Sequence, residues 1–334
     1  MAVAIAGDIT GGAKDSSTLK LIEGISNTDA LSPKSKSSYT ELVNAIQNRA
    51  SVPIEEVVIN PTKYIPQFKK WYVKETTLKS QFSTILTLFK YNSDYKEANP
   101  KIYKTWLEAF TEAKAIVDAR YETNKPTEKQ TTGYVPYEDI IKARDGLPAG
   151  HINKLLLDMY TYLRPMRCEY AKVAIYKQRS GLPEESKREP NYILINSTQT
   201  SARLIISFFK TRKHHDAYDM KLPKELFEDL KLSLKTTPRD WLFVNSSGTP
   251  YNSNLYTKWT MRVFASIFKR PLTVALIRHA YINTIDFNTL SIKDKKEIAT
   301  SMGHTIETQD RYRLLFDDKK SSCDCVCTPK DAKD

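Results

Sequence analysis

The sequence predicts an α+β protein that is mainly helical and has two domains. In the first third of the chain, apolar residues recur at steps of three and four, which is the spacing of amphipathic helices. Runs of β-branched and aromatic residues gather between residues 171 and 223, where we expect a small antiparallel sheet among helices. A polar stretch over residues 123–136, with Pro126 and Gly133 and no apolar period, is the best linker candidate between the two regions.

The start of the chain is rich in Gly, Ser, Thr and Ala and shows no sustained period, so we expect a flexible arm over residues 1–30. No basic segment precedes Asp8, and a signal peptide is therefore not expected. The pattern changes at Ser32 and Pro33, which suit the N-cap and the first position of a helix. An all-helical domain is expected over residues 31–122.

The helices of this first domain share an apolar stripe, with Lys and Arg on much of the remaining surface. They are expected over residues 35–49, 61–72, 76–92 and 99–122. In the third of them, Leu78, Phe82, Ile85 and Phe89 recur at helical spacing.

The second domain is expected over residues 137–316, followed by a flexible tail over 317–334. Two helical patterns, over 133–147 and 149–165, precede the strands. The expected strands span residues 171–178, 191–197 and 202–211, with a last strand over 215–223. Helices are then expected around residues 224–234, 254–268, 274–286 and 291–303, before a helical segment that carries Tyr312.

The composition favours a polyanionic partner. The 334 residues include 51 Lys and Arg against 39 acidic residues, a formal net charge of +12, and such an excess binds polyanions through counterion release. No run of about 18 apolar residues exists, so no membrane span is expected.

The four cysteines indicate a reducing, intracellular compartment, because they form no disulfide framework. Cys168 stands alone, and Cys323, Cys325 and Cys327 form a C-x-C-x-C tail. Such a tail could hold a metal, but no second cluster matches it, and incidental thiols are the preferred interpretation. We expect no metal or other cofactor.

Tyr312 is the candidate nucleophile. A tyrosine hydroxyl has a pKa of about 10 and attacks poorly at neutral pH, but cations that also hold a phosphate would activate it. Arg167 is one such cation, since its planar fork matches phosphate oxygens, and Glu169 could hold that fork in place. The alternative for Arg167 is a surface salt bridge.

Lys210 lies at the end of a predicted strand, where a polar turn begins, and could donate a proton to a leaving oxygen. Lys213 is close enough to leave that assignment open, and an exposed turn lysine is the alternative for both. Arg278 and His279 lie within an otherwise apolar helix, so Arg278 needs either a buried ion pair or a bound anion. His304, after Gly303, could donate to a phosphate oxygen or serve a structural role.

The order of these residues resembles the catalytic domain of the tyrosine recombinases, and the resemblance covers roughly residues 31–316. In particular the chain resembles the divergent integrases of giant DNA viruses, virophages and related mobile elements. The segments that correspond to the motifs of that family, in order, are 166–170 (MRCEY), 210–211 (KT), 277–281 (IRHAY), 302–304 (MGH), Gln309 and Tyr312.

Two features depart from the family pattern. The common H-x-x-R-H motif has a histidine three residues before the second arginine, and this chain has Ala275 there. The role of that histidine in handling the tyrosine proton would be vacant, or taken by His279 or by water. Tyr312 follows His304 by eight residues, where nine is common in the bacterial enzymes.

The resemblance implies that DNA is cut and rejoined through a 3′-phosphotyrosyl intermediate without metal or ATP. Tyr312 would attack the scissile phosphate, while Arg167, Arg278 and His304 stabilise charge on its oxygens. Lys210 would protonate the leaving 5′-oxygen.

The resemblance also implies double-stranded DNA as the partner and a homo-oligomer, a tetramer, on that DNA. The helical first domain would cover the other face of the duplex and contact its backbone with lysines. The candidate lysines are Lys69, Lys70, Lys74 and Lys79 in this domain, with Lys213 in the second. If the origin is viral, the expected site of action is the host nucleus, a viral factory or the virion.

Three other interpretations fit parts of the pattern. A type IB topoisomerase uses the same catalytic set and relaxes supercoils without exchanging strands, but the helical N-terminal domain favours a recombinase. A DNA-binding protein on a catalytically decayed recombinase fold is supported by Ala275 and opposed by the presence of every other candidate. A basic structural protein would make the order of these residues a coincidence.

Overall fold

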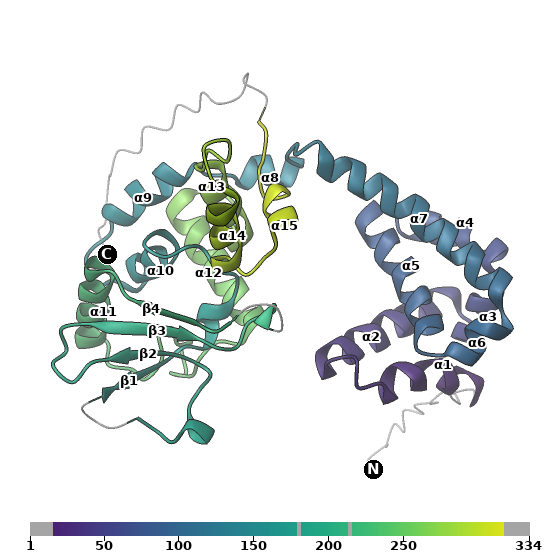
Figure 1. Ribbon diagram of the computed structural model, residues 1–334, viewed down its shortest axis with the longest axis horizontal. Coiled ribbons are helices and arrows are strands. Elements are labelled where there is room, and N and C mark those ends of the chain that lie inside the picture. The colour runs from purple at the N-terminus through teal and green to yellow at the C-terminus, as the bar shows by residue number, and fades with distance from the viewer. Residues whose placement is uncertain (1–15, 179–181, 213–215, 317–334) are drawn as a thin grey trace, which may run out of the picture. The chain divides into compact units, whose positions relative to one another are not determined.

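The computed structural model describes residues 16–178, 182–212 and 216–316 of the chain (Figure 1). Lys213 and the C-x-C-x-C tail, both candidates from the sequence, lie outside these residues. The chain divides into two compact units, Met1–Thr123 and Asn124–Asp334, and the predicted end of the first domain lies one residue before this boundary. None of the helices in the described ranges is long and apolar enough to cross a membrane.

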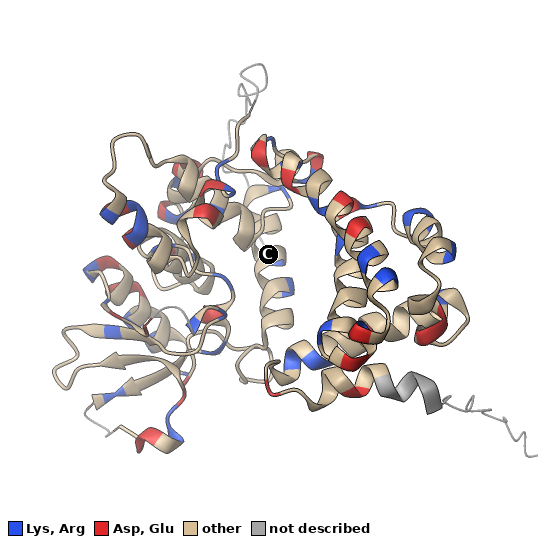
Figure 2. Ribbon diagram, turned by 45° about the vertical axis from the view of Figure 1, so that its right-hand side comes forward, with Lys and Arg blue, Asp and Glu red and all other residues tan. Residues whose placement is uncertain are grey.

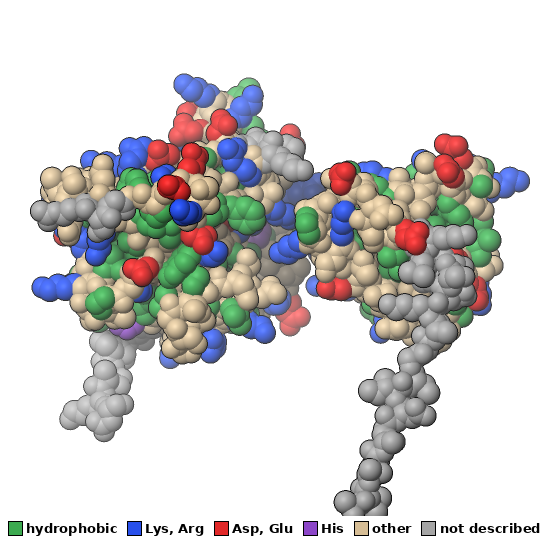
Figure 3. All heavy atoms as spheres, turned by 90° about the horizontal axis from the view of Figure 1, so that it is seen from below, with side chains coloured by type: hydrophobic (Ala, Val, Ile, Leu, Met, Phe, Trp, Pro, Cys, Tyr) green, Lys and Arg blue, Asp and Glu red, His purple; other side chains and the backbone are tan. Residues whose placement is uncertain are grey.

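The first unit is built of helices throughout its described residues. They are α1 (Ser16–Asn27), α2 (Pro33–Ala50), α3 (Ile54–Ile59), α4 (Pro61–Trp71), α5 (Glu75–Lys90), α6 (Ser93–Ala98) and α7 (Pro100–Glu122). Aromatic rings form the centre of its core, where Phe68 and Phe82 stack with centroids 5.6 Å apart and the buried Trp106 donates to the Val58 carbonyl at 2.8 Å. Charged residues of both signs are scattered over this unit among polar and apolar side chains (Figures 2 and 3).

Helix α1 corrects the expected arm over residues 1–30, which is wrong for Ser16–Asn27. Leu21 and Ile25 are four residues apart and both are buried in the core of the unit. The side-chain amide of Asn92 also donates to the Leu21 carbonyl at 3.0 Å. Burial of this short apolar stripe supplies stability that the polar composition of the segment conceals.

The second unit combines helices with one small sheet, which confirms the predicted α+β, mainly helical fold class. Its helices are α8 (Glu128–Gly133), α9 (Tyr137–Asp145), α10 (Ile152–Thr161), α11 (Lys224–Thr236), α12 (Ser253–Phe268), α13 (Val274–Asn283), α14 (Ile292–Ser301) and α15 (Ile306–Asp310), with short 3-10 turns at η1 (Glu169–Lys172) and η3 (Glu185–Lys187). The strands are β1 (Ala174–Lys177), β2 (Asn191–Ile195), β3 (Ala202–Ile206) and β4 (Tyr218–Lys221).

The sheet has the strand order β1-β2-β3-β4 and is mixed. The expected antiparallel pairing holds for β2 with β3 and for β3 with β4. It is wrong for β1 and β2, which run parallel with Ala174 opposite Tyr192. The connection over residues 178–190 is long enough for the crossover that parallel strands need, whereas a hairpin loop is not.

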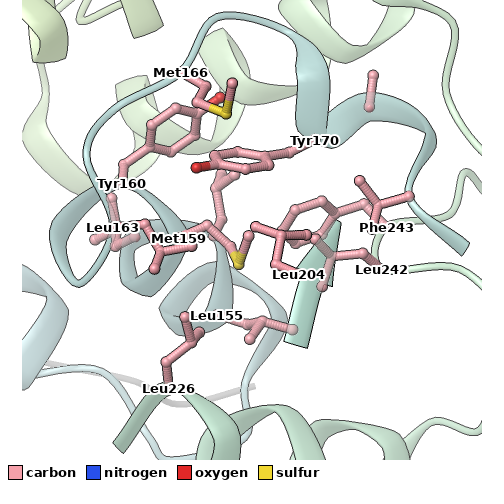
Figure 4. Close-up of a cluster of buried hydrophobic side chains, with 14 of the residues drawn as sticks. Leu155, Met159, Tyr160, Leu163, Met166, Tyr170, Leu204, Leu226, Leu242 and Phe243 are labelled. Atoms are coloured by element: carbon pink, nitrogen blue, oxygen red, sulfur yellow. The ribbon is translucent and has the colours of Figure 1, made fainter. Parts of the chain in front are cut away.

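Helix α10 contributes to the same hydrophobic core as the strands (Figure 4). Met159 lies near Leu204 of β3 and Tyr160 packs on Tyr170, and all four side chains are fully buried. The hydroxyl of Tyr160 donates to the carbonyl of Arg167 at 2.9 Å. The core therefore fixes the loop that carries the first candidate arginine.

The segment expected to be a linker contains helix α8 and packs on the second unit. Thr127 and Gln130 form a capping box at the start of α8. A Cβ at Gly133 would lie 2.7 Å from the Pro271 carbonyl oxygen, so only glycine permits this close approach. The Leu315 amide donates to the carbonyl of Asn124 at 2.9 Å, so the first residue of the unit meets the last residues that the structure describes.

Candidate active site

Tyr312 lies in a turn just after α15, in a half-buried position. The expectation that a helix carries it is wrong, because α15 ends at Asp310. Thr305 caps the start of α15 by accepting from the Thr308 amide, and the Tyr312 amide donates to the Gln309 carbonyl at 2.9 Å. These local contacts fix the turn that presents the tyrosine.

Arg278 of α13 is the central cation of the site and is only 1% exposed. Its guanidinium donates to the carbonyls of Pro165 and Met302, to Nδ1 of His304 at 3.0 Å and to the Tyr312 hydroxyl at 3.3 Å. Among the described residues, these four acceptors are all neutral groups and include no carboxylate. The hydrogen bonds therefore hold the guanidinium without cancelling its positive charge. Of the two alternatives for a buried arginine, this geometry favours an anion site.

Gly303 joins three segments that are far apart in the sequence. It follows α14 with a φ of 67°, in the left-handed region that glycine adopts without strain. Its carbonyl accepts from Nη1 of Arg167 at 3.0 Å and from the Thr211 hydroxyl at 3.1 Å. The turn after α14 therefore holds Arg167 and the loop after β3 in place.

His304 is buried beside Arg278 and Tyr312. Because a guanidinium can only donate, Nδ1 of His304 must accept, and the neutral ring then carries its proton on Nε2. The ring stacks on the Tyr312 ring, with centroids 5.1 Å apart and an interplanar angle of 26°. His304 thus presents an N–H donor next to the candidate nucleophile.

The environment of Tyr312 lowers the pKa of its hydroxyl below the ordinary value. Burial raises this pKa, but the charges of Arg278 and Arg167 and the hydrogen bonds from them lower it by more. The guanidinium carbon of Arg278 also lies 4.9 Å from the centre of the tyrosine ring. A half-buried tyrosine with two arginines near its hydroxyl is poised to lose its proton.

Comparison with known proteins places this geometry on a known fold. No protein-family model matches the chain, and no curated protein matches its sequence. Among solved structures, the integrase of transposon Tn1549 in complex with transposon right-end DNA matches over 90% of this chain and 95% of that one, with 12% identity and a TM-score of 0.51. This chain has the tyrosine recombinase fold.

Two further recombinases match less well. The XerA recombinase is 13% identical over 90% of this chain and 94% of its own, with a TM-score of 0.34. The lambda integrase, solved as a tetramer bound to a Holliday junction, is 16% identical over 93% of this chain and 79% of its own, with a TM-score of 0.37.

On this recombinase fold, the structure brings Arg167, Arg278, His304 and Tyr312 together. Lys210 is placed less tightly, because β3 ends at Ile206 and the lysine is exposed in the loop that follows. Its neighbour Thr211 ties that loop to the site through the Gly303 carbonyl. Since Lys213 lies outside the described residues, the choice between the two lysines stays a prediction.

In the described residues, Glu169 and Arg167 form no salt bridge, so the predicted contact between them is not present. The Arg167 guanidinium binds the Gly303 carbonyl instead. Glu169 begins η1, and one of its carboxylate oxygens is buried without a hydrogen bond to any group in the described ranges. Arg167 lies before η1, and its guanidinium is taken up by the turn after α14 rather than by Glu169.

His279 contacts the backbone of Tyr312 rather than its hydroxyl. Its Nδ1 lies 2.6 Å from the Tyr312 carbonyl oxygen, so this nitrogen donates. Ala275 is exposed one turn earlier on α13 and contributes no proton acceptor. Within the described ranges, no group of three or more His, Cys, Asp or Glu could hold a metal ion.

The candidate DNA-binding lysines of the first unit differ in their surroundings. Lys69 pairs with Glu112 at 3.0 Å, and Lys79 lies 4.0 Å from Asp118. Lys70 and Lys74 are exposed at the end of α4 and just before α5. Their part in DNA binding remains a prediction.

Sequence reasoning missed the main-chain groups that hold the arginines. The carbonyls of Pro165, Met302 and Gly303 have no signal in the sequence, because every residue carries a carbonyl. Thr211 could have been found from its place beside Lys210 in the second motif. Gln130 could not, because it lies in a segment that was expected to be a linker.

Proposed function

We propose that this protein is a site-specific DNA recombinase, an integrase, that cuts and rejoins DNA through a 3′-phosphotyrosyl intermediate. The observation that carries the proposal is the hydrogen bond from the buried Arg278 to the Tyr312 hydroxyl, beside His304 and Arg167. This arrangement combines a nucleophile with lowered pKa and cations whose charge is not cancelled by a carboxylate hydrogen bond. Cleavage of a phosphodiester uses both, since the nucleophile attacks the phosphorus and the cations stabilise the charge on the phosphate oxygens.

The reaction follows from the donors on the site. The Tyr312 hydroxyl would lose its proton to water, its oxygen would attack the scissile phosphorus, and the bond from phosphorus to the 5′-oxygen would break. Arg167, Arg278 and the Nε2–H of His304 would stabilise the charge on the non-bridging oxygens. Lys210 would supply a proton to the leaving 5′-oxygen. Attack of a 5′-hydroxyl from a second duplex on the phosphotyrosine would rejoin the strands and release Tyr312.

Strand exchange between two duplexes involves four strands, and each cut needs its own nucleophile. Since each chain supplies one Tyr312, the proposal includes a tetramer on DNA. The Lys-rich helices of the first unit would contact the phosphate backbone of the same DNA. Integration of mobile DNA, such as a viral genome, is the biological process that we propose for this activity.

Trapping on nicked suicide duplexes tests the proposal. A duplex library of random sequence removes the need to know the recognition site. Wild-type protein should form a covalent adduct that survives denaturation, with the nucleotide on Tyr312 by peptide mass spectrometry, and Tyr312→Phe should form none. An adduct in the phenylalanine variant would reject Tyr312 as nucleophile, and no adduct with wild-type protein would reject the recombinase.

A second assay separates recombination from relaxation. Supercoiled plasmids that carry two copies of the sequence selected from the library should yield recombinant products with the wild-type protein. Relaxed plasmid without recombinant product would instead indicate a topoisomerase.

A further inference from the structure

A chain of contacts runs from helix α8 to the backbone of the proposed nucleophile. The amide nitrogen of Gln130 lies 3.5 Å from Nε2 of His279, and Nδ1 of His279 lies 2.6 Å from the Tyr312 carbonyl. An amide NH2 group donates and a carbonyl accepts. The two contacts therefore select one form of His279, a neutral ring with its proton on Nδ1.

The surroundings of His279 favour the same form. Burial lowers the pKa of His279, the contact with the Tyr312 carbonyl raises it, and the charge of Arg278 lowers it again, with a net shift below the ordinary value. The neutral ring is then the state at physiological pH. With Nδ1 committed to a carbonyl and Nε2 facing Gln130, neither nitrogen is directed at the Tyr312 hydroxyl.

One turn further along α13, a second residue holds the same segment. Asn283 donates from its side-chain amide to the Leu314 carbonyl at 2.9 Å and accepts from the Leu314 amide at 2.9 Å. His279 and Asn283 are four residues apart, so they share a face of the helix. Helix α13 thus holds the main chain at Tyr312 and Leu314 while Arg278 holds the hydroxyl.

We propose that His279 and Gln130 are positioning residues for the nucleophile, and that His279 does not exchange a proton with it. This inference rests on the proposed function of Tyr312. His279 holds the carbonyl of Tyr312, so that the hydroxyl of the same residue stays within reach of Arg278. Gln130 keeps the imidazole of His279 in the form that carries its proton on Nδ1. Gln130 is thus the residue of α8 that contributes to placing the nucleophile.

Rescue by asparagine distinguishes positioning from proton transfer. The amide nitrogen of asparagine is as many bonds from Cα as Nδ1 of histidine, and it donates but does not titrate. We expect the rate of adduct formation on the suicide duplex library to fall about 10- to 100-fold in His279→Ala, as for a nucleophile displaced by about 1 Å. His279→Asn should stay within a few-fold of wild type with an unchanged pH profile. Gln130→Ala should lose a few-fold.

Thr132→Ala is the matched control, because Thr132 is exposed on α8 and its hydroxyl bonds only within that helix in the described structure. Its rate should equal that of wild type. An asparagine variant as slow as the alanine variant, with the acidic limb of the pH profile lost in both, would overturn the inference in favour of proton transfer.

A readout independent of activity separates this inference from the proposed function. Hydrogen exchange of the peptide that spans residues 311–316 should be faster in His279→Ala than in wild type, and His279→Asn should restore protection. If wild-type protein forms no adduct but this pattern holds, the proposed function fails and the positioning contact stands. Equal exchange in all three proteins would overturn the positioning role.

Discussion

At the scale of single residues, two buried ionisable groups, one in the site and one outside it, have different consequences. Arg278 is held by four neutral acceptors, so its charge is available to an anion. Asp158 of α10 is also fully buried, and its nearest cations are Lys154 at 3.8 Å and Arg144 at 3.9 Å. The first group is placed for chemistry, and the second leads to a dependence of stability on pH.

Replacing Arg278 by lysine should keep the positive charge but disrupt the set of four hydrogen bonds that the guanidinium donates. A single ammonium cannot reach four acceptors that a planar fork spans. We expect Arg278→Lys to slow adduct formation about 100- to 1,000-fold, the usual loss for a donor that stabilises the transition state. Because the hydrogen bond from Arg278 contributes to the lowered pKa of Tyr312 and would be lost, the rise of the rate with pH should also move to higher pH. Rates measured on the suicide duplex library across pH test both effects.

The control is Arg203→Lys, which changes an exposed arginine that pairs with Asp219 on the sheet at 2.8 Å. It should leave both the rate and its pH dependence unchanged. A lysine at 278 that preserves the wild-type rate would contradict the assigned role of the guanidinium.

Asp158 should make the folded protein less stable as pH rises through the range between its unfolded and folded pKa values. Burial is the main cause that raises its pKa from 3.8 to about 7, so between these values the folded state binds a proton that the unfolded state lacks. The free energy of unfolding should fall by about 2 to 4 kcal/mol from this group between about pH 4 and 7, and then level off. Urea unfolding at several pH values measures it.

Asp158→Asn is the comparison, because it keeps the shape and removes the titration. Lys154 retains Asp229 as a partner at 3.3 Å in this variant. The variant should show a flatter dependence of stability on pH than the wild type. Identical slopes would mean that the carboxyl is ionised in the folded protein throughout this range.

At the scale of elements, the end of α14 organises the site more than any strand does. The left-handed Gly303 turns the chain so that its carbonyl meets Arg167 and Thr211, while the next residue, His304, meets Arg278. One turn of backbone thus brings together the loop before η1, the loop after β3 and helix α13.

Gly303→Ala should impair both stability and catalysis. A positive φ costs a non-glycine residue about 1 to 2 kcal/mol, and the added Cβ would lie 3.3 Å from Oγ1 of Thr211. Gly248→Ala is a matched control, since Gly248 has a φ of 74° and no described atom lies within 4 Å of the added Cβ. Both variants should lose similar stability in urea unfolding, and only Gly303→Ala should lose adduct formation. Equal activity in both would argue against the role of this turn.

At the scale of the whole molecule, the sequence predicts long elements and chemical groups better than it predicts their partners. In helices α2, α5 and α7 the apolar stripe repeats over several turns, and such a long repeat is distinct from a chance arrangement of apolar residues. Helix α1 is short and lies in a polar segment, and its burial against the core decides its structure. The parallel pairing of β1 depends on a crossover that no local pattern encodes.

The same limit applies to the site. An arginine inside an apolar helix predicts either a buried ion pair or an anion site, because the cost of burial is a local property of Arg278. The separation of Arg167 from Glu169 was not predictable from their spacing, since it depends on where Gly303 arrives from a distant helix. Roles that depend on the chemistry of one residue could thus be predicted from the sequence, and roles that depend on tertiary main-chain contacts could not.

DNA binding by the whole molecule should depend on salt through the first unit. Replacing both Lys70 and Lys74 by glutamine should weaken binding to a random-sequence duplex similarly for all sequences. The slope of log affinity against log salt should fall by about 0.9 for each phosphate that the variant no longer neutralises. Lys69→Gln should have a smaller effect, because Glu112 already neutralises that lysine. Fluorescence anisotropy at several salt concentrations measures these slopes, and unchanged slopes would place the DNA-binding surface elsewhere.

The hydrogen bond between the Leu315 amide and the Asn124 carbonyl has a consequence for the order of the chain. The start of the second unit adjoins Leu315, so a short peptide could join them and new ends could be opened in an exposed turn such as residues 246–249. A circularly permuted unit of this kind would retain every contact of Arg278 and Tyr312. The geometry of the site therefore depends on the contacts between its segments and not on the order of those segments along the chain.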